Sequence, residues 1–274
     1  MMSNGARLAR LPGRAGDERA QWAAGRIGKR RSIMKFMLLA YESAADFTCR
    51  TSKDGPAYRE GWTAFGAALR EAGLYVAGAA LREPATGATL RAPEGKRLVQ
   101  DGPFADSKEQ LGGYLVLEAP SLDVALEWAA KCPASKSGAV ELRPVLPVGC
   151  DIEGRGKGTM FGLLAYQPPA DFAVRSGPAS QAYWEGWSAF GAALREAGAF
   201  VAGVGLQPAE TATTLRSKDG KRLVQDGPYA DTKEQLGGLF VVAAASMEEA
   251  LGWAARCPAA THGAVEVRPL LTVP

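Results

Sequence analysis

Short apolar runs and amphipathic stretches alternate along the chain. Residues 36–41 form an apolar run with the length of a buried strand. Residues 57–72 then place Trp62, Phe65 and Leu69 three and four positions apart, which is the spacing of the apolar face of a helix. The pattern therefore predicts a strand followed by a helix that packs on it.

Further segments complete an ordered set of elements. Strand-like runs follow at residues 75–81, 89–91, 97–100, 114–118 and 140–143, and an amphipathic helix is predicted at residues 121–131. The two short runs in the middle predict a hairpin. Strand, helix, strand, hairpin, strand, helix, strand is the order of a ferredoxin-like α+β domain, with both helices on one face of an antiparallel sheet.

The whole pattern occurs twice. Residues 35–148 align with residues 160–273 without a gap, and more than half of the aligned positions are identical. We therefore expect two domains, at residues 34–149 and 159–274. Each predicted sheet has one bare face, which the identical surface of the other copy can cover about a pseudo-twofold axis. The sequence thus predicts two ferredoxin-like domains that pack sheet against sheet as an intrachain pseudo-dimer.

Two segments lie outside the copies. Residues 150–158 are polar and rich in glycine, which predicts a flexible linker. Residues 1–33 hold eight Lys or Arg residues against Asp17 and Glu18. We interpret this basic segment as a disordered extension, or as the product of an upstream start codon, in preference to a targeting or nucleic-acid-binding arm.

Composition narrows the class of protein. The chain is 47% hydrophobic and 22% charged, as soluble globular proteins are, and no apolar run approaches the roughly 18 residues of a membrane-spanning helix. Outside the basic segment the chain is mildly acidic, whereas nucleic-acid binding requires a basic face. No C-x-x-C pair and no nucleotide-binding motif occurs. We expect a cytoplasmic protein with no membrane or nucleic-acid partner, no metal and no cofactor.

Three motifs stand in both copies. In the first copy they are DGPF at residues 101–104, KEQLGG at 108–113 and ELRP at 141–144, and the second copy has DGPY, KEQLGG and EVRP at the equivalent positions. On these motifs the chain resembles the YCII-related, or DGPF, family. The resemblance implies a dimeric α/β-barrel-like assembly, related to muconolactone isomerase, with a cavity between sheet and helices.

The resemblance also frames two hypotheses of function. The first is a protein that binds a small, anionic molecule in this cavity, with isomerase- or lyase-like catalysis left open. The alternative is a non-enzymatic regulatory or interaction module, because family members are often encoded beside sigma factors of the extracytoplasmic-function type. Fold resemblance does not choose between them. Assembly into a higher oligomer is also left open.

Acidic residues of the motifs are candidate ligand-binding groups. Asp101 and Asp226 are either structural caps of the Asp-Gly-Pro turn or carboxylates of a pocket. Glu109 and Glu234 follow a lysine, and either they belong to a solvated face or they point inward before the paired glycines. The sequence leaves both alternatives open for each pair.

Arg143 and Arg268 are further candidates, because each stands on a terminal strand between apolar residues. An unpaired buried guanidinium is costly, so each arginine either pairs with a carboxylate or binds an anionic ligand. Glu141 and Glu266 lie two residues earlier on the same strand face and favour the ion pair. If the motif residues frame one pocket, Asp101 converges with Glu109 and Arg143 on a single cavity.

Tyr41 and Tyr166 end the first strand of each copy, where they either donate a hydroxyl into the cavity or pack as aromatic core. Some members of the family carry a His–Asp catalytic dyad. This sequence has one histidine, His262, and its counterpart in the first copy is Ser137. A histidine-dependent mechanism is therefore not available to both copies, and we interpret His262 as a surface or packing residue.

Overall fold

The computed structural model describes residues 33–53, 55–105, 107–153, 158–218, 221–230 and 232–271. The basic segment at residues 1–33 therefore lies outside the described residues, except for Ile33. Within the described ranges, no helix is both long and apolar enough to cross a membrane.

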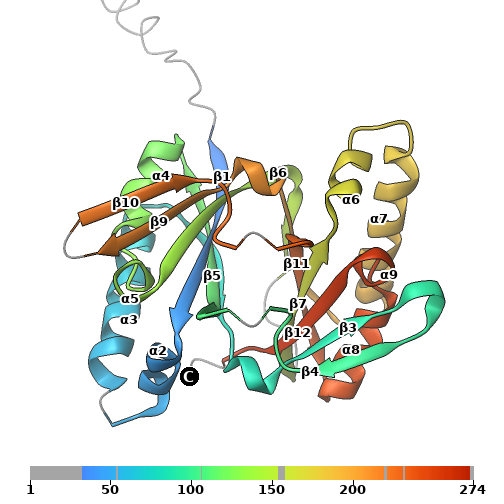
Figure 1. Ribbon diagram of the computed structural model, residues 1–274, viewed down its shortest axis with the longest axis horizontal. Helices are drawn as coiled ribbons and strands as arrows, with labels where there is room; N and C mark the ends of the chain where they lie inside the picture. The colour runs from blue at the N-terminus through green and yellow to red at the C-terminus, as the bar shows by residue number, and fades with distance from the viewer. Residues whose placement is uncertain are drawn as a thin grey trace, which may run out of the picture. The chain divides into compact units, whose positions relative to one another are not determined.

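The described chain is a mixed α+β structure dominated by antiparallel strands (Figure 1). The first copy contains β1 (Met34–Ser43), α2 (Ala44–Thr51), α3 (Gly55–Glu71), β2 (Tyr75–Ala80), β3 (Ala88–Arg91), β4 (Leu98–Asp101), β5 (Glu109–Ala119), α4 (Leu122–Ala129), α5 (Ala134–Ser137) and β6 (Ala139–Ile152). The second contains β7 (Thr159–Gln167), α6 (Pro169–Val174), α7 (Ser180–Glu196), β8 (Phe200–Leu206), β9 (Thr213–Lys218), β10 (Lys221–Asp226), β11 (Gln235–Ala244), α8 (Met247–Arg256), α9 (Ala259–His262) and β12 (Ala264–Pro269). The α-helices and strands of the two copies follow in the same order.

Some elements differ from the sequence pattern. Helices α2 and α6 lie where no helix is predicted, and α2 begins with a capping box in which Ser43 and Asp46 each accept a hydrogen bond from the backbone N–H of the other. Strand β5 starts earlier than predicted, because its KEQLGG segment pairs with the end of β1, with Glu109 opposite Ser43 and Gly113 opposite Ala40.

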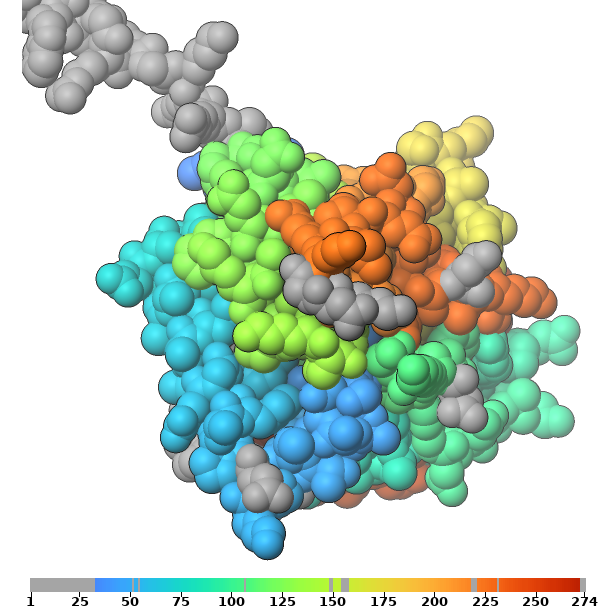
Figure 2. Space-filling view, turned by 60° about the vertical axis from the view of Figure 1, so that its left-hand side comes forward, coloured from blue at the N-terminus to red at the C-terminus, as the bar shows by residue number. Residues whose placement is uncertain are grey.

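The hairpin of each copy pairs with the sheet of the other copy. Strands β3 and β4 join β12, with Thr89 opposite Glu266, and strands β9 and β10 join β6, with Thr214 opposite Glu141. Figure 1 places β9 and β10 beside α4 and α5, and in Figure 2 orange atoms of the second copy lie against light-green atoms of the first. We call β3–β4 and β9–β10 the exchanged hairpins.

Strand β6 also links the two sheets. The expected flexible linker begins at residue 150, but Cys150 and Ile152 extend β6 and pair with Val204 and Ala202 of β8. The polar character of this segment is compatible with a strand because the side chains of Asp151 and Glu153 are exposed to solvent. Residues 154–157 lie outside the described part of the chain.

Three apolar clusters explain the layering. Alternate residues of β1 point to opposite faces, so that Phe36 and Leu38 pack with α3 and α4, whereas Met37 and Leu39 pack in a cluster with residues of both copies. The third cluster packs α7 and α8 on the second sheet and includes Leu90 from an exchanged hairpin. Helices therefore cover the outer sheet faces, and the inner faces share one core.

Candidate functional site

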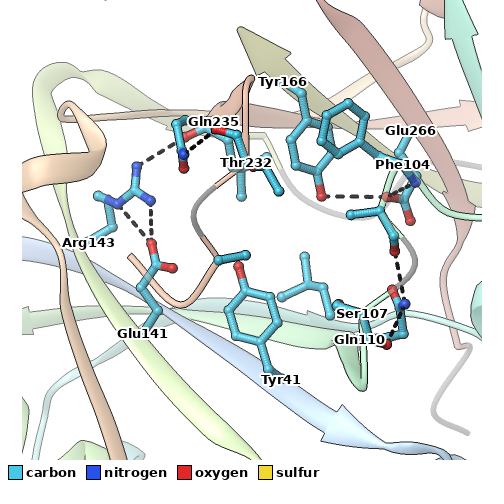
Figure 3. Close-up of a pocket in the computed structure, with 14 residues that line it drawn as sticks. Tyr41, Phe104, Ser107, Gln110, Glu141, Arg143, Tyr166, Thr232, Gln235 and Glu266 are labelled. Carbon is cyan, nitrogen blue, oxygen red and sulfur yellow. Dashed lines mark hydrogen bonds and ion pairs between the residues drawn. The ribbon is translucent and has the colours of Figure 1, made fainter. Parts of the chain in front are cut away.

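A cavity of about 40 Å³ lies between residues of the two copies (Figure 3). We call it the central cavity, and a space of this size holds about three water molecules. Its lining consists mostly of equivalent pairs, namely Tyr41 and Tyr166, Ala105 and Ala230, Ser107 and Thr232, Gln110 and Gln235, Leu111 and Leu236, and Glu141 and Glu266, together with Phe104 and Arg143.

The exchanged hairpins close this cavity by carrying aromatic residues from one copy to the other. Phe104, which follows β4, stacks on Tyr166 of β7 with ring centroids 4.0 Å apart. Tyr229, which follows β10, stacks on Tyr41 of β1 at the same separation. Each tyrosine of the cavity is thus held by the DGPF or DGPY segment of the other copy, and stacking of this kind stabilises the arrangement beyond simple burial.

The two tyrosine hydroxyls differ in their partners. Tyr166 donates to Glu266 Oε2 at 3.5 Å, whereas no described residue accepts a hydrogen bond from the Tyr41 hydroxyl, which points into the cavity in Figure 3. Burial raises the pKa of both tyrosines well above its ordinary value, and the neighbouring Glu141 or Glu266 carboxylate raises it further. Both phenols are therefore protonated at neutral pH and act as hydrogen-bond donors.

A buried ion pair stands at each end of the cavity. Arg143 Nε lies 2.9 Å from Glu141 Oε1, and Arg268 Nη1 lies 2.7 Å from Glu266 Oε1. The remaining oxygens accept backbone N–H groups of the other copy, from Tyr229 to Glu141 at 2.9 Å and from Phe104 to Glu266 at 3.0 Å. Both carboxylates are thereby paired and hydrogen-bonded, as buried charges require.

The same arginines bind main-chain carbonyls across the interface of the copies. Arg143 donates to the carbonyls of Gln207 and Leu236, and Arg268 donates to those of Arg82 and Leu111. The sequence left open whether each arginine pairs with a carboxylate or binds an anionic ligand, and in the structure each pairs with a glutamate. Both arginine side chains are 1% exposed or less.

Comparison with known proteins identifies the family. A model of the YCII-related domain matches residues 34–149 and again residues 160–273. The chain belongs to the YCII-related family. An uncharacterised protein of Rhizobium meliloti (strain 1021) is 46% identical over 67 residues, which are 24% of this chain and 54% of the relative. The chain thus spans about half the length of the curated relative that it matches.

Glu109 and Glu234 lie beside the central cavity of this tandem YCII-related protein without lining it. Glu109 accepts a hydrogen bond from the Tyr229 hydroxyl and lies 3.5 Å from Arg216, and Glu234 lies 2.9 Å from Arg91 Nη1. Burial opposes ionisation of Glu109, but the hydrogen bond from Tyr229 and the charge of Arg216 together lower its pKa. Each glutamate therefore binds an exchanged hairpin of the other YCII-related copy.

Asp101 and Asp226 end the outer strands of the hairpins with exposed side chains. The glycines that follow them, Gly102 and Gly227, have φ of +92° and +98°, as the turn requires. The expected convergence of Asp101, Glu109 and Arg143 on one cavity is not seen, since only Arg143 lines the central cavity. Asp101 and Asp226 are therefore exposed turn residues that do not line the central cavity.

Gln110 and Gln235 line the cavity although the sequence interpretation did not single them out, and their place in the KEQLGG motif was the available signal. His262 is exposed on α9, 3.4 Å from Asp171, and does not line the cavity. Within the described residues, no group of three or more His, Cys, Asp or Glu side chains is placed to hold a metal ion.

Proposed function

We propose that this YCII-related chain binds a small polar molecule with an anionic oxygen in the central cavity, within a dimeric α/β-barrel-like pseudo-dimer of its two copies. The observation that carries the proposal is the Tyr41 hydroxyl, a protonated donor that faces the cavity and has no acceptor among the described residues. Stacking on Tyr229 holds the Tyr41 ring in place, so its hydroxyl is positioned to donate to a ligand oxygen in the cavity.

The size and polarity of the site restrict the ligand. A space of about 40 Å³ fits a molecule of a few heavy atoms, such as a short carboxylate. The Gln235 amide and the Arg143 guanidinium also reach its wall, and each has one N–H beyond its hydrogen bonds to described residues. The Gln110 amide donates both of its N–H groups to the carbonyls of Ala105 and Ser107. A ligand with two oxygens would bridge the two halves of the pseudo-dimer.

The same groups favour an isomerase- or lyase-like step as a second candidate function. Glu141 is the carboxylate that most affects Tyr41, so a base and a neutral phenol lie together. The carboxylate would accept a proton from a carbon beside a carbonyl, while the phenol donates a hydrogen bond to the oxyanion that forms. Exchange of substrate hydrogen with deuterated water would reveal this step.

Binding is tested with acetate and glycolate as probes. We expect either anion to raise the melting temperature in a saturable manner, because a ligand that binds only the folded state stabilises it. Tyr41→Phe should abolish the shift. Tyr166→Phe is the matched control and should retain most of it, because the Tyr166 hydroxyl already donates to Glu266. The proposal is wrong if neither anion stabilises the protein, or if the two variants behave alike.

A further inference from the structure

A second and larger cavity lies in the second copy and shares no lining residue with the central cavity. It has a volume of about 310 Å³ and is bounded by α7, β8 and β11. Tyr183, Trp184, Trp187 and Phe240 give it aromatic walls, and Arg175 reaches it from the segment between α6 and α7. We call it the side cavity, and its size falls in the range of small-molecule sites.

The equivalent arginine of the first copy is neutralised. Arg50 forms an ion pair with Glu42, whose side chain is 1% exposed, and Tyr58 also donates to this carboxylate. Arg50 Nε lies 3.3 Å from the Tyr58 oxygen. The positive charge of the first copy is therefore balanced within the fold.

The second copy keeps the arginine and the tyrosine but replaces the carboxylate. Gln167 stands where Glu42 does, and its amide oxygen accepts from Arg175 Nη2 at 2.6 Å. The other acceptors of Arg175 are the Tyr183 hydroxyl at 3.1 Å and the carbonyls of Leu206 and Gly237. All of these acceptors are neutral, so the described residues give Arg175 no ion-pair partner.

Two acidic residues near the side cavity already have other partners. Asp151 at one end forms an ion pair with Arg195, which also binds Glu153 at 2.5 Å. Asp171 accepts from the Gln167 amide at 3.4 Å and lies 3.4 Å from His262 Nδ1, but forms no ion pair with Arg175. Neither carboxylate takes the place of Glu42.

Trp184 of the second copy lines the side cavity and stands at the position equivalent to Arg59 of the first copy. In the first copy Arg59 donates to the carbonyl of Arg50, and in the second Trp184 Nε1 donates to the carbonyl of Arg175 at 3.1 Å. The substitution keeps the hydrogen bond but exchanges a second positive charge for an indole that packs edge-on against Tyr183. The arginine is thus left at the polar end of an aromatic cavity.

We infer that the side cavity binds an organic oxyanion with an aromatic or apolar body. The anion pairs with Arg175, because its four acceptors among the described residues leave one of its five N–H groups free, and the Tyr183 hydroxyl lies beside it. The body of the ligand packs against the tryptophans and Phe240. The site is specific to the second copy, because only there does the buried carboxylate give way to an amide.

The test uses the full chain and calorimetric titration with benzoate, which is too large for the central cavity. We expect saturable binding of benzoate and much weaker binding of benzyl alcohol, its neutral analogue. Gln167→Glu should weaken benzoate binding at least about tenfold, because it gives Arg175 the internal partner that Arg50 has. Since the first copy folds with this same pair, the variant is expected to fold.

Arg175→Met provides a second variant and should abolish benzoate binding, because it removes the positive charge altogether. Thermal unfolding checks that each variant is folded. Phenyl phosphate, titrated in parallel, shows which oxyanion the site prefers. The inference is overturned if the native chain binds neither benzoate nor phenyl phosphate, if benzyl alcohol binds as tightly as benzoate, or if folded Gln167→Glu retains the native affinity.

Discussion

The buried arginines of the terminal strands have a structural task at the level of single residues. Arg143 and Arg268 pair with a glutamate of their own strand and, at the same time, hydrogen-bond to main-chain carbonyls of the other copy. Replacing a buried ion pair by apolar residues is often neutral, but removing one partner leaves an uncompensated charge. The arginines therefore fix how the copies meet.

We predict that Arg143→Met lowers the free energy of unfolding by about 3–5 kcal/mol, because Glu141 is left as a buried charge without its cation. The pseudo-twofold equivalent, Arg268→Met, should cost a similar amount. Urea denaturation followed by circular dichroism measures both. Arg97→Met is the control, since the Arg97–Glu248 pair is solvent-exposed and should change stability by less than about 1 kcal/mol. Similar losses in buried and exposed variants would contradict the prediction.

The residues of the site were predictable only in part. The spacing of Glu141 and Arg143 on one strand face indicates their pairing, because alternate strand residues share a face. The partners of Glu109 were not predictable, because Tyr229 and Arg216 reach it from the other copy. A sequence pattern carries local spacing and no information on which distant segment supplies a contact.

Among the elements, α2 depends on its first residue. Ser43 accepts a hydrogen bond from the Asp46 N–H, and Asp46 in turn accepts from the Ser43 N–H. In the second copy Pro168 stands at the Ser43 position, and no side-chain cap is present on α6. In the first copy, Ser43 followed by Asp46 was a local signal for the start of α2. The segment that forms α2 has few apolar residues, so no helical periodicity supported that signal.

We predict that Ser43→Ala lowers the free energy of unfolding by about 1 kcal/mol, the usual effect of losing a capping side chain. Chemical denaturation gives the value. Pro168→Ala in the second copy serves as the comparison, because no capping hydrogen bond is lost there. An equal or larger loss in Pro168→Ala than in Ser43→Ala would show that the cap is not what stabilises α2.

The element order, by contrast, followed from the sequence. Apolar periodicity placed most strands and the helices α3, α4, α7 and α8, because these elements bury one face against a sheet. The pairing of each hairpin with the sheet of the other copy did not follow from the sequence. The two copies share the segment GKRLVQDGP, so pairing within a copy and pairing between copies satisfy the same sequence pattern.

For the whole molecule, the exchanged hairpins make each sheet a product of both copies. Strand β12 pairs with β3, and strand β6 pairs with β9. The core between the inner sheet faces also contains residues of both copies, such as Met37 and Val241. Separation of the copies would expose the apolar core and break the pairing of β6 with β9 and of β12 with β3. Exposed apolar surface and unpaired backbone groups are both unfavourable.

We predict that the copies stay together when the chain between them is cut. A protease site inserted between Glu153 and Gly158 allows the folded protein to be cleaved there. The two fragments should elute as one species in size-exclusion chromatography and separate only in denaturant, because the hydrogen bonds and core between them do not need the connecting peptide. Fragments that elute apart without denaturant would disprove this.

The presence of both copies in one chain also has a genetic consequence. In a dimer of identical subunits, one codon specifies the residue on both sides of the twofold axis. Every mutation therefore changes both equivalent positions together. Here each side has its own codon, and a change such as glutamate at 42 against glutamine at 167 is made on one side alone. Fusion into one chain therefore allows the side chains of one copy to change while the equivalent side chains of the other copy stay the same. Each copy still supplies a hairpin to the sheet of the other.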